Sequence, residues 1–164
     1  LFINLVTDSL PAIAIGMERS TKDILKEKPR NPSVGILTPA TMKQLGIQGI
    51  LIAIVTMSAY FLGLKESWAI ATTMAFSTLC LSRLFHGFNC RSQRSLYRIG
   101  LFTNKYSILA FVIGFCFLNA ILLWQPLHSL FSVTTITMTQ LFTIYGLALI
   151  PTALIQLGRM LRHR

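Results

Sequence analysis

Three polar side chains interrupt the first apolar stretch of the sequence, LFINLVTDSLPAIAIG. Asn4, Thr7 and Asp8 stand at positions i, i+3 and i+4, which share one face of an α-helix. Their amide, hydroxyl and carboxylate oxygens are ligands that suit a hard cation such as Ca²⁺. Pro11 cannot donate a backbone hydrogen bond to the carbonyl of Thr7, and carbonyls freed in this way can also coordinate cations. The spacing therefore predicts a metal site at Asn4, Thr7 and Asp8.

Asp8 and Arg83 are the charged residues that lie inside long apolar runs. A carboxylate at membrane depth costs about 2.5–3.5 kcal/mol, so it normally faces a partner or an ion. Arg83 could point inward as the charge partner of Asp8, or it could extend to the membrane surface. Two interpretations of Asp8 stay open: an ion ligand, or a carboxyl group that pairs with a buried base or is protonated.

The composition is that of a membrane protein. Of the 164 residues, 53% are hydrophobic and only 12% are charged, against about 25% charged in a typical soluble domain. We therefore expect an integral protein whose partner is the lipid bilayer. The net charge of +10 comes from Lys and Arg placed between apolar runs, which indicates membrane topology and not a nucleic-acid partner. Cysteine and histidine are scattered without metal-ligand spacing.

The lengths of the apolar runs predict the fold class. A membrane core of about 30 Å needs about 20 apolar residues in a helix. The sequence predicts an all-α fold, in which residues 1–164 form one polytopic transmembrane bundle of five spans. The first span is short and interrupted near Pro11. The expected spans are 1–16, 46–64, 67–88, 106–124 and 133–158.

The connections between the spans alternate in charge. Loops 17–45 and 89–105 and the C-terminal tail hold most of the Lys and Arg, so the positive-inside rule places all three in the cytoplasm. Trp68 and Trp124 then belong to the opposite interface. Thr38 as N-cap and Pro39 at the first helical position predict a short interfacial helix, with a solvated linker as the alternative. Because the sequence begins inside an apolar segment without Met, we expect a piece of a longer protein.

Three quoted stretches resemble one family. NLVTDSLPAIAIG is similar to the sixth membrane helix of calcium-transporting P-type ATPases, of the P2 type of cation pump. KDILKEKPRNP resembles the cytoplasmic loop that follows it there, and ATTMAFSTL resembles the start of the eighth helix. The resemblance covers the whole chain and implies the C-terminal membrane region of such a pump, its helices six to ten. Ser9 stands where the family usually has glycine.

The resemblance implies roles for individual residues. Asn4, Thr7 and Asp8 match the family's cation ligands, and Arg83 falls where some members have a ligand glutamate. A guanidinium cannot bind Ca²⁺ and would act as a tethered positive charge, which implies one ion per cycle. In the family, the residue at the position of Thr7 serves mainly the second ion site, which the arginine at position 83 would remove. Of the three implied ligands, the role of Thr7 is therefore the one most affected.

The resemblance also implies parts that these residues do not contain. The family's DKTGT phosphorylation motif does not occur here, so we expect no catalytic or cofactor-binding residue in this chain, which alone should be inactive. ATP and Mg²⁺ would be used by the cytoplasmic domains of the same polypeptide, and its N-terminal helices would complete the bundle. The expected protein exports Ca²⁺ across a bacterial-type plasma membrane and keeps its C-terminus in the cytoplasm. Three alternatives remain, a pump for Mn²⁺ or another cation, a channel or secondary transporter, and a structural membrane anchor.

Overall fold

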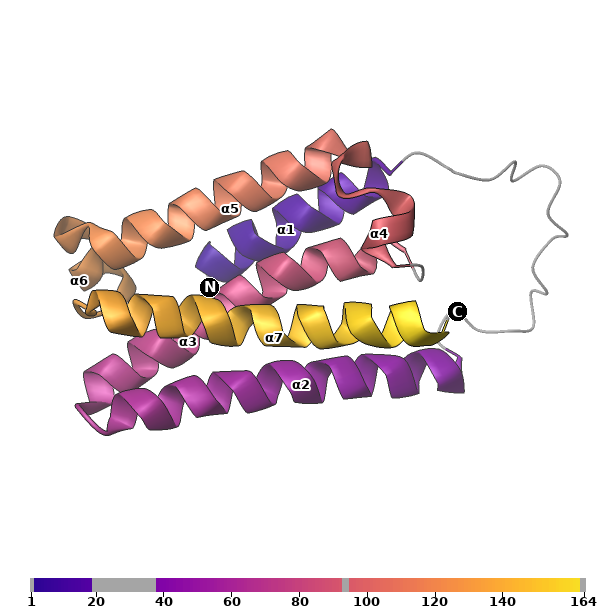
Figure 1. Ribbon diagram of the computed structural model, residues 1–164. Coiled ribbons are helices and arrows are strands. Elements are labelled where there is room, and N and C mark those ends of the chain that lie inside the picture. The colour runs from indigo at the N-terminus through magenta and orange to yellow at the C-terminus, as the bar shows by residue number, and fades with distance from the viewer. Residues whose placement is uncertain (1, 19–37, 93–94, 163–164) are drawn as a thin grey trace, which may run out of the picture.

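The computed structural model describes residues 2–18, 38–92 and 95–162, and every regular element in these ranges is a helix. The all-α prediction is confirmed for this part of the chain. The long helices and the four shorter elements are shown in Figure 1. They are α1 (Phe2–Gly16), α2 (Pro39–Leu64), α3 (Trp68–Cys90), α4 (Leu96–Ile99), η2 (Leu101–Thr103), α5 (Lys105–Leu123), η3 (Gln125–Leu127), α6 (His128–Phe131) and α7 (Met138–Arg162).

Within the described residues, four helices are long and apolar enough to cross a membrane: α2, α3, α5 and α7. Helix α1 has 15 residues. At 1.5 Å per residue it is about 22 Å long, shorter than the ~30 Å membrane core. Of the five predicted spans, four thus correspond to helices long enough to cross a membrane, and the first corresponds to the shorter helix α1.

The start of α2 corrects one boundary of the prediction. The helix begins at Pro39, and the Thr38 hydroxyl caps it by accepting from the Thr41 N–H at 3.3 Å. The cap and the proline were predicted here, but they open the long helix itself and not a separate interfacial one. Lys43 does not stop the helix, because a lysine near a helix end can carry its ammonium to the membrane surface. The rest of the predicted loop, 19–37, lies outside the described residues.

Neither proline inside a long run breaks its helix. Helix α1 is continuous through Pro11, and α7 is continuous through Pro151. The predicted interruption near Pro11 is therefore wrong as a break in the helix. A proline removes only its own N–H bond, and the bonds of its neighbours keep the helix together inside a packed bundle.

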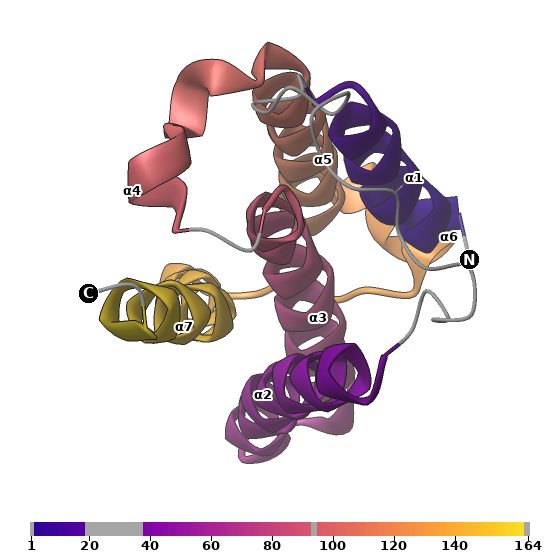
Figure 2. The same cartoon turned by 90° about the vertical axis from the view of Figure 1, so that its right-hand side faces the viewer.

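Helix α3 lies at the centre of the bundle and packs against α1, α2, α5 and α7 (Figure 2). Its Leu81 and Leu84 meet Leu118 of α5 and Ile144 of α7 in the buried core. Helix α2 comes closest at Gly63, where an added Cβ would lie 2.7 Å from the Cα of Ala71. That glycine is needed because α2 and α3 touch backbone to backbone there.

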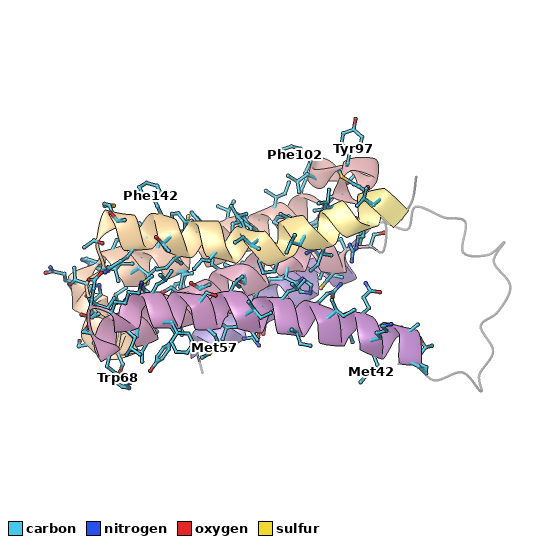
Figure 3. The ribbon with its side chains drawn as sticks, turned by 60° about the horizontal axis from the view of Figure 1, so that its bottom comes forward. Met42, Met57, Trp68, Tyr97, Phe102 and Phe142 are labelled. Carbon is cyan, nitrogen blue, oxygen red and sulfur yellow. The ribbon has the colours of Figure 1, made fainter. Side chains whose placement is uncertain are left out.

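The two ends of the bundle differ in charge. The ends of α3 and α7 and the start of α5 lie at the end where α1 also finishes (Figure 1), and this basic end holds Arg91, Lys105 and Arg159. At the opposite end, Lys65 is the one Lys or Arg among the described residues. Trp68 is exposed there (Figure 3), and Trp124 ends α5 at the same end. This segregation is what a membrane-spanning bundle with a basic cytoplasmic face requires.

Polar side chains join the outer helices to their neighbours through interhelical hydrogen bonds. The Tyr145 hydroxyl donates to the Asn119 side-chain oxygen, which joins α7 to α5. Gln140 Nε2 donates to Glu66 Oε2 at 2.7 Å, which joins α7 to the turn between α2 and α3. Buried amides of this kind fix how neighbouring membrane helices are rotated.

Helix α7 also closes the C-terminal end of α3. Arg159 Nη1 donates to the carbonyls of Asn89 at 2.9 Å and Ser92 at 2.7 Å. Gln156 donates to Asn89 Oδ1 at 2.6 Å and accepts from the Leu96 N–H at 2.8 Å. The last carbonyls of a helix need donors from elsewhere, and an arginine also complements the helix dipole.

Candidate ion-binding site between α1 and α3

The two charged residues from the apolar runs meet in the structure. Arg83 Nη1 of α3 lies 3.2 Å from Asp8 Oδ2 of α1. The Asp8 side chain is 46% exposed and that of Arg83 is 39% exposed, so the pair lies at a surface of the described bundle and not in its core. At this distance the positive charge of the guanidinium compensates the negative charge of the carboxylate. Of the two alternatives that the sequence left open for Arg83, the structure has the pairing with Asp8.

The other predicted ligands are placed differently. Thr7 is 1% exposed, packed into the bundle, whereas the next residue, Asp8, is open. Asn4 belongs to α1, but its side chain lies outside the described residues. The structure therefore does not bring the predicted three oxygens to one open surface. Of the two predicted ligands whose side chains the structure describes, Asp8 is the exposed one.

Pro11 and Gly87 pack the two helices closely, one turn beyond the Asp8–Arg83 pair. A Cβ added at Gly87 would meet the Pro11 Cβ at 3.4 Å. Beside this contact is a cavity of about 10 Å³, lined by Pro11, Ile15, Leu84, Gly87, Phe88, Ser107 and Phe111. Such a volume holds about one water molecule. It is too small and too apolar to be an ion site.

A second ion pair joins the same two helices at the basic end. Arg91 donates from Nε to Glu18 Oε2 and from Nη2 to Glu18 Oε1, both at 2.9 Å. The Arg91 side chain is 0% exposed and that of Glu18 is 21% exposed. The hydrogen bonds from Arg91 are the largest influence and hold the pKa of the Glu18 carboxyl below its ordinary value. Burial opposes them with a smaller upward effect, and the hydrogen bond from Asn104 adds a still smaller lowering.

The surroundings of Arg91 satisfy the rest of its donors. Nη1 also donates to the Leu101 carbonyl at 2.9 Å, and Nη2 donates to the Thr103 hydroxyl at 3.2 Å. Asn104 Nδ2 donates to Glu18 Oε2 at 2.6 Å and to the Ala14 carbonyl at 2.9 Å. The end of α1 is thus tied to the end of α3 and to the start of α5.

Our sequence reasoning missed this second pair, because Glu18 and Arg91 are 73 residues apart. A usable signal existed in the spacing. Glu18 follows Asp8 by ten residues, and Arg91 follows Arg83 by eight. Two parallel helices with acids on one and bases on the other at similar intervals can pair twice, once at each interval.

The described residues include no group of three or more His, Cys, Asp or Glu that could hold a metal ion. At this site, the described chain offers an ion one carboxylate, Asp8, with a guanidinium beside it. Further ligands for any cation must come from other groups, since Ca²⁺ takes six to eight oxygens.

Comparison with known proteins agrees with the geometry. The sequence profile of the family described as "Cation transporting ATPase, C-terminus" matches residues 1–161. The chain belongs to this family. The prediction that it is the C-terminal membrane region of a P-type cation pump is therefore confirmed.

Individual relatives of this chain carry names that specify the ion. A "Calcium-transporting ATPase" of Bacillus subtilis (strain 168) is 35% identical over 94% of the chain and 18% of its own length. "Calcium-transporting ATPase lmo0841" of Listeria monocytogenes is 42% identical over 70% of the chain and 13% of its own length. "Calcium-transporting ATPase type 2C member 1" of Homo sapiens is 28% identical over 90% of the chain and 16% of its own length. The chain thus spans less than a fifth of each of these relatives.

Proposed function

We propose that this chain is the C-terminal transport region of an ATP-driven pump that exports Ca²⁺ from the cytoplasm, one ion per cycle. Asp8 would be a ligand of that ion, Asn4 and Thr7 would lie near it, and Arg83 would be its positive neighbour. The observation that carries the proposal is the Asp8–Arg83 ion pair on the open side of α1, in a family of cation-transporting ATPases. The family favours a pump over a channel or a structural anchor.

The charge at the site supports one ion. With Arg83 beside it, the negative charge of Asp8 is already matched when no ion is bound. A divalent ion about 4 Å from the guanidinium would be repelled by about 8 kcal/mol at an effective dielectric constant of about 20. Binding of the first ion therefore requires Arg83 to move away from Asp8, and a second ion would meet the same guanidinium. On ion release, Arg83 returns to Asp8 and the carboxylate is not left uncompensated in the membrane.

The remaining parts of the pump belong to the proposal as well. The phosphorylated domain, with ATP and Mg²⁺, and the other membrane helices would come from the rest of the polypeptide. Helix α1 would be the fifth and shortest span of this region, in addition to α2, α3, α5 and α7. The basic end would face the cytoplasm of a bacterial-type cell, in its plasma membrane, as the positive-inside rule expects.

The test is ATP hydrolysis and ⁴⁵Ca uptake by the complete pump in sealed liposomes, with Ca²⁺ and Mn²⁺ titrated separately. We expect activation by micromolar Ca²⁺ that Asp8→Asn abolishes, because the amide lacks the ligand charge. Glu66→Gln is the matched control. It removes a carboxylate at the opposite end of the bundle, where the amide can still accept from Gln140, and should leave activation unchanged.

The stoichiometry distinguishes the role of Arg83. Arg83→Glu removes the guanidinium and adds a carboxylate, so the number of Ca²⁺ ions moved per ATP should rise from one toward two. An unchanged ratio and pH profile in this variant would mean that Arg83 is only structural. Activation by Mn²⁺ alone would assign the pump to that ion, and activity untouched by Asp8→Asn would refute the site.

A further inference from the structure

Large apolar side chains stand outside the bundle at its basic end. They lie in residues 95–106, here called the α4–η2 segment, which leads from α3 to α5. Tyr97 is 85% exposed and Phe102 is 77% exposed, and Leu101 and Tyr106 are also exposed. Figure 3 shows Tyr97 and Phe102 projecting from the same side of the bundle. Exposed aromatic side chains gathered in one short segment mark an interaction surface.

The backbone of the α4–η2 segment is held against the bundle. The Leu96 N–H donates to Gln156 Oε1 at 2.8 Å, and Arg91 donates to the Leu101 carbonyl at 2.9 Å. Gly100 makes the turn between α4 and η2 with φ +85°, which a residue with a side chain rarely adopts. The rings therefore point outward from a backbone that is bonded inward, and their exposure is a property of the fold.

This aromatic surface continues into the membrane-facing surface of α5. Tyr106, Leu109 and Ile113 are exposed and stand at i, i+3 and i+7, on one face of the helix. Leu109 and Ile113 belong to a candidate membrane span, so the face they share with Tyr106 is apolar enough to lie against lipid tails. Phe102 and Tyr97 then lie where this face leaves the hydrocarbon, at the depth of the lipid headgroups. Tyrosine and tryptophan are enriched at that depth.

Basic residues outnumber acidic ones in the part of the sequence that forms this surface. Residues 91–105 hold Arg91, Arg94, Arg98 and Lys105, and no Asp or Glu occurs anywhere from 67 to 164. Glu18 neutralises the buried Arg91, while Lys105 is exposed. A headgroup with a net negative charge would be attracted here, and each basic side chain near a membrane surface strengthens such binding.

We propose that the α4–η2 segment is a binding surface for an anionic phospholipid, with the rings of Tyr97 and Phe102 in the headgroup layer and Lys105 at the phosphate. Figure 2 shows α4 between α5 and α7, on the side of the bundle away from α1. The lipid would thus bind far from the open side of Asp8. This inference does not depend on which ion the pump moves.

Photo-crosslinking in the complete protein tests the proposal without ATP or Ca²⁺. Phe102→p-benzoylphenylalanine places the probe in the surface, and Leu130→p-benzoylphenylalanine places it at an equally open position of α6, at the opposite end, where Leu130 is 73% exposed. Each variant is reconstituted in phosphatidylcholine nanodiscs with a small equal fraction of alkyne-tagged phosphatidylglycerol or alkyne-tagged phosphatidylcholine. Labelled adducts are counted after irradiation.

At position 102 we expect phosphatidylglycerol adducts to exceed phosphatidylcholine adducts several-fold, and at position 130 we expect equal yields. Lys105→Gln should lower the phosphatidylglycerol yield at 102 by about fivefold, and Lys105→Arg should retain it. Equal yields of the two lipids at 102 would overturn the proposal. Adducts of position 102 with another part of the protein, in place of lipid, would overturn it as well.

Discussion

The ion pair between Glu18 and Arg91 predicts an asymmetric response to mutation. Arg91 is fully enclosed, whereas Glu18 keeps 21% of its side chain in contact with the surroundings. Glu18→Ala therefore leaves a buried cation without its carboxylate. Removal of one partner from a buried pair costs about 3–5 kcal/mol, because the charge that remains cannot reach water. We expect a loss of free energy of unfolding in this range.

The reverse change should cost less. In Arg91→Met the carboxylate of Glu18 keeps the hydrogen bond from Asn104 and can be reached by water. The Arg91→Met variant should lose about 1–3 kcal/mol of free energy of unfolding, which is the cost of the acceptors that Arg91 leaves without a hydrogen bond. The double variant Glu18→Ala/Arg91→Met removes both charges. We expect it to be more stable than Glu18→Ala alone, because no buried charge is left unpaired.

The measurement is unfolding of the complete pump in mixed micelles by increasing sodium dodecyl sulphate, for the wild type, both single variants and the double variant. The matched control is Glu66→Ala at the opposite end, whose partner is the neutral Gln140. A double variant that loses as much as the two single variants added together would refute the reasoning. So would a Glu18→Ala variant that is no less stable than Glu66→Ala.

Two further predictions follow from the described contacts. The pKa of Glu18 is lowered, so the stability that its ionised carboxylate contributes is complete above the ordinary value of 4.5 and is lost as the pH falls through the lowered pKa. The difference in free energy of unfolding between wild type and Glu18→Gln should therefore shrink in acid. A constant difference down to pH ~3 would contradict this. Gly63→Ala should cost about 1–3 kcal/mol, because its Cβ would lie 2.7 Å from the Ala71 Cα, a backbone atom. Gly49→Ala, with nothing within 4 Å, should not lose stability in the same unfolding assay, and equal effects of the two changes would argue against close α2–α3 contact.

Local sequence patterns were enough to predict the long membrane helices of this fold. The apolar runs fell into α2, α3, α5 and α7, and the cap at Thr38 was found because capping depends on a few adjacent residues. Helix continuity through Pro11 could not be predicted in the same way. A proline is compatible with a continuous helix inside a packed bundle, and the packing partner of Pro11 here is Gly87, more than seventy positions along the chain.

The sequence was enough to predict which residue types form the candidate site, but not how their side chains are arranged. Asp8 stood out because a carboxylate in an apolar run is costly. The direction of Arg83 could not be read from its own helix, because it is decided by where α1 lies. Thr7 shares a helix face with Asp8 in the sequence pattern, yet the bundle buries one and leaves the other open. The pairing of Glu18 with Arg91 required the relative placement of α1 and α3.

The closure of α3 by Arg159 has a consequence for the order in which the chain is assembled. The carbonyls of Asn89 and Ser92 receive their donor from residues 70 and 67 positions later in the chain. At a synthesis rate of ~5–20 residues per second, the ribosome needs roughly 4–14 s to make that stretch. During this interval Asn89 and Ser92 have been synthesised while Arg159 has not. The basic end can therefore reach its final form only after α7 is inserted, so the synthesis of α7 and the closure of this end are coupled in time.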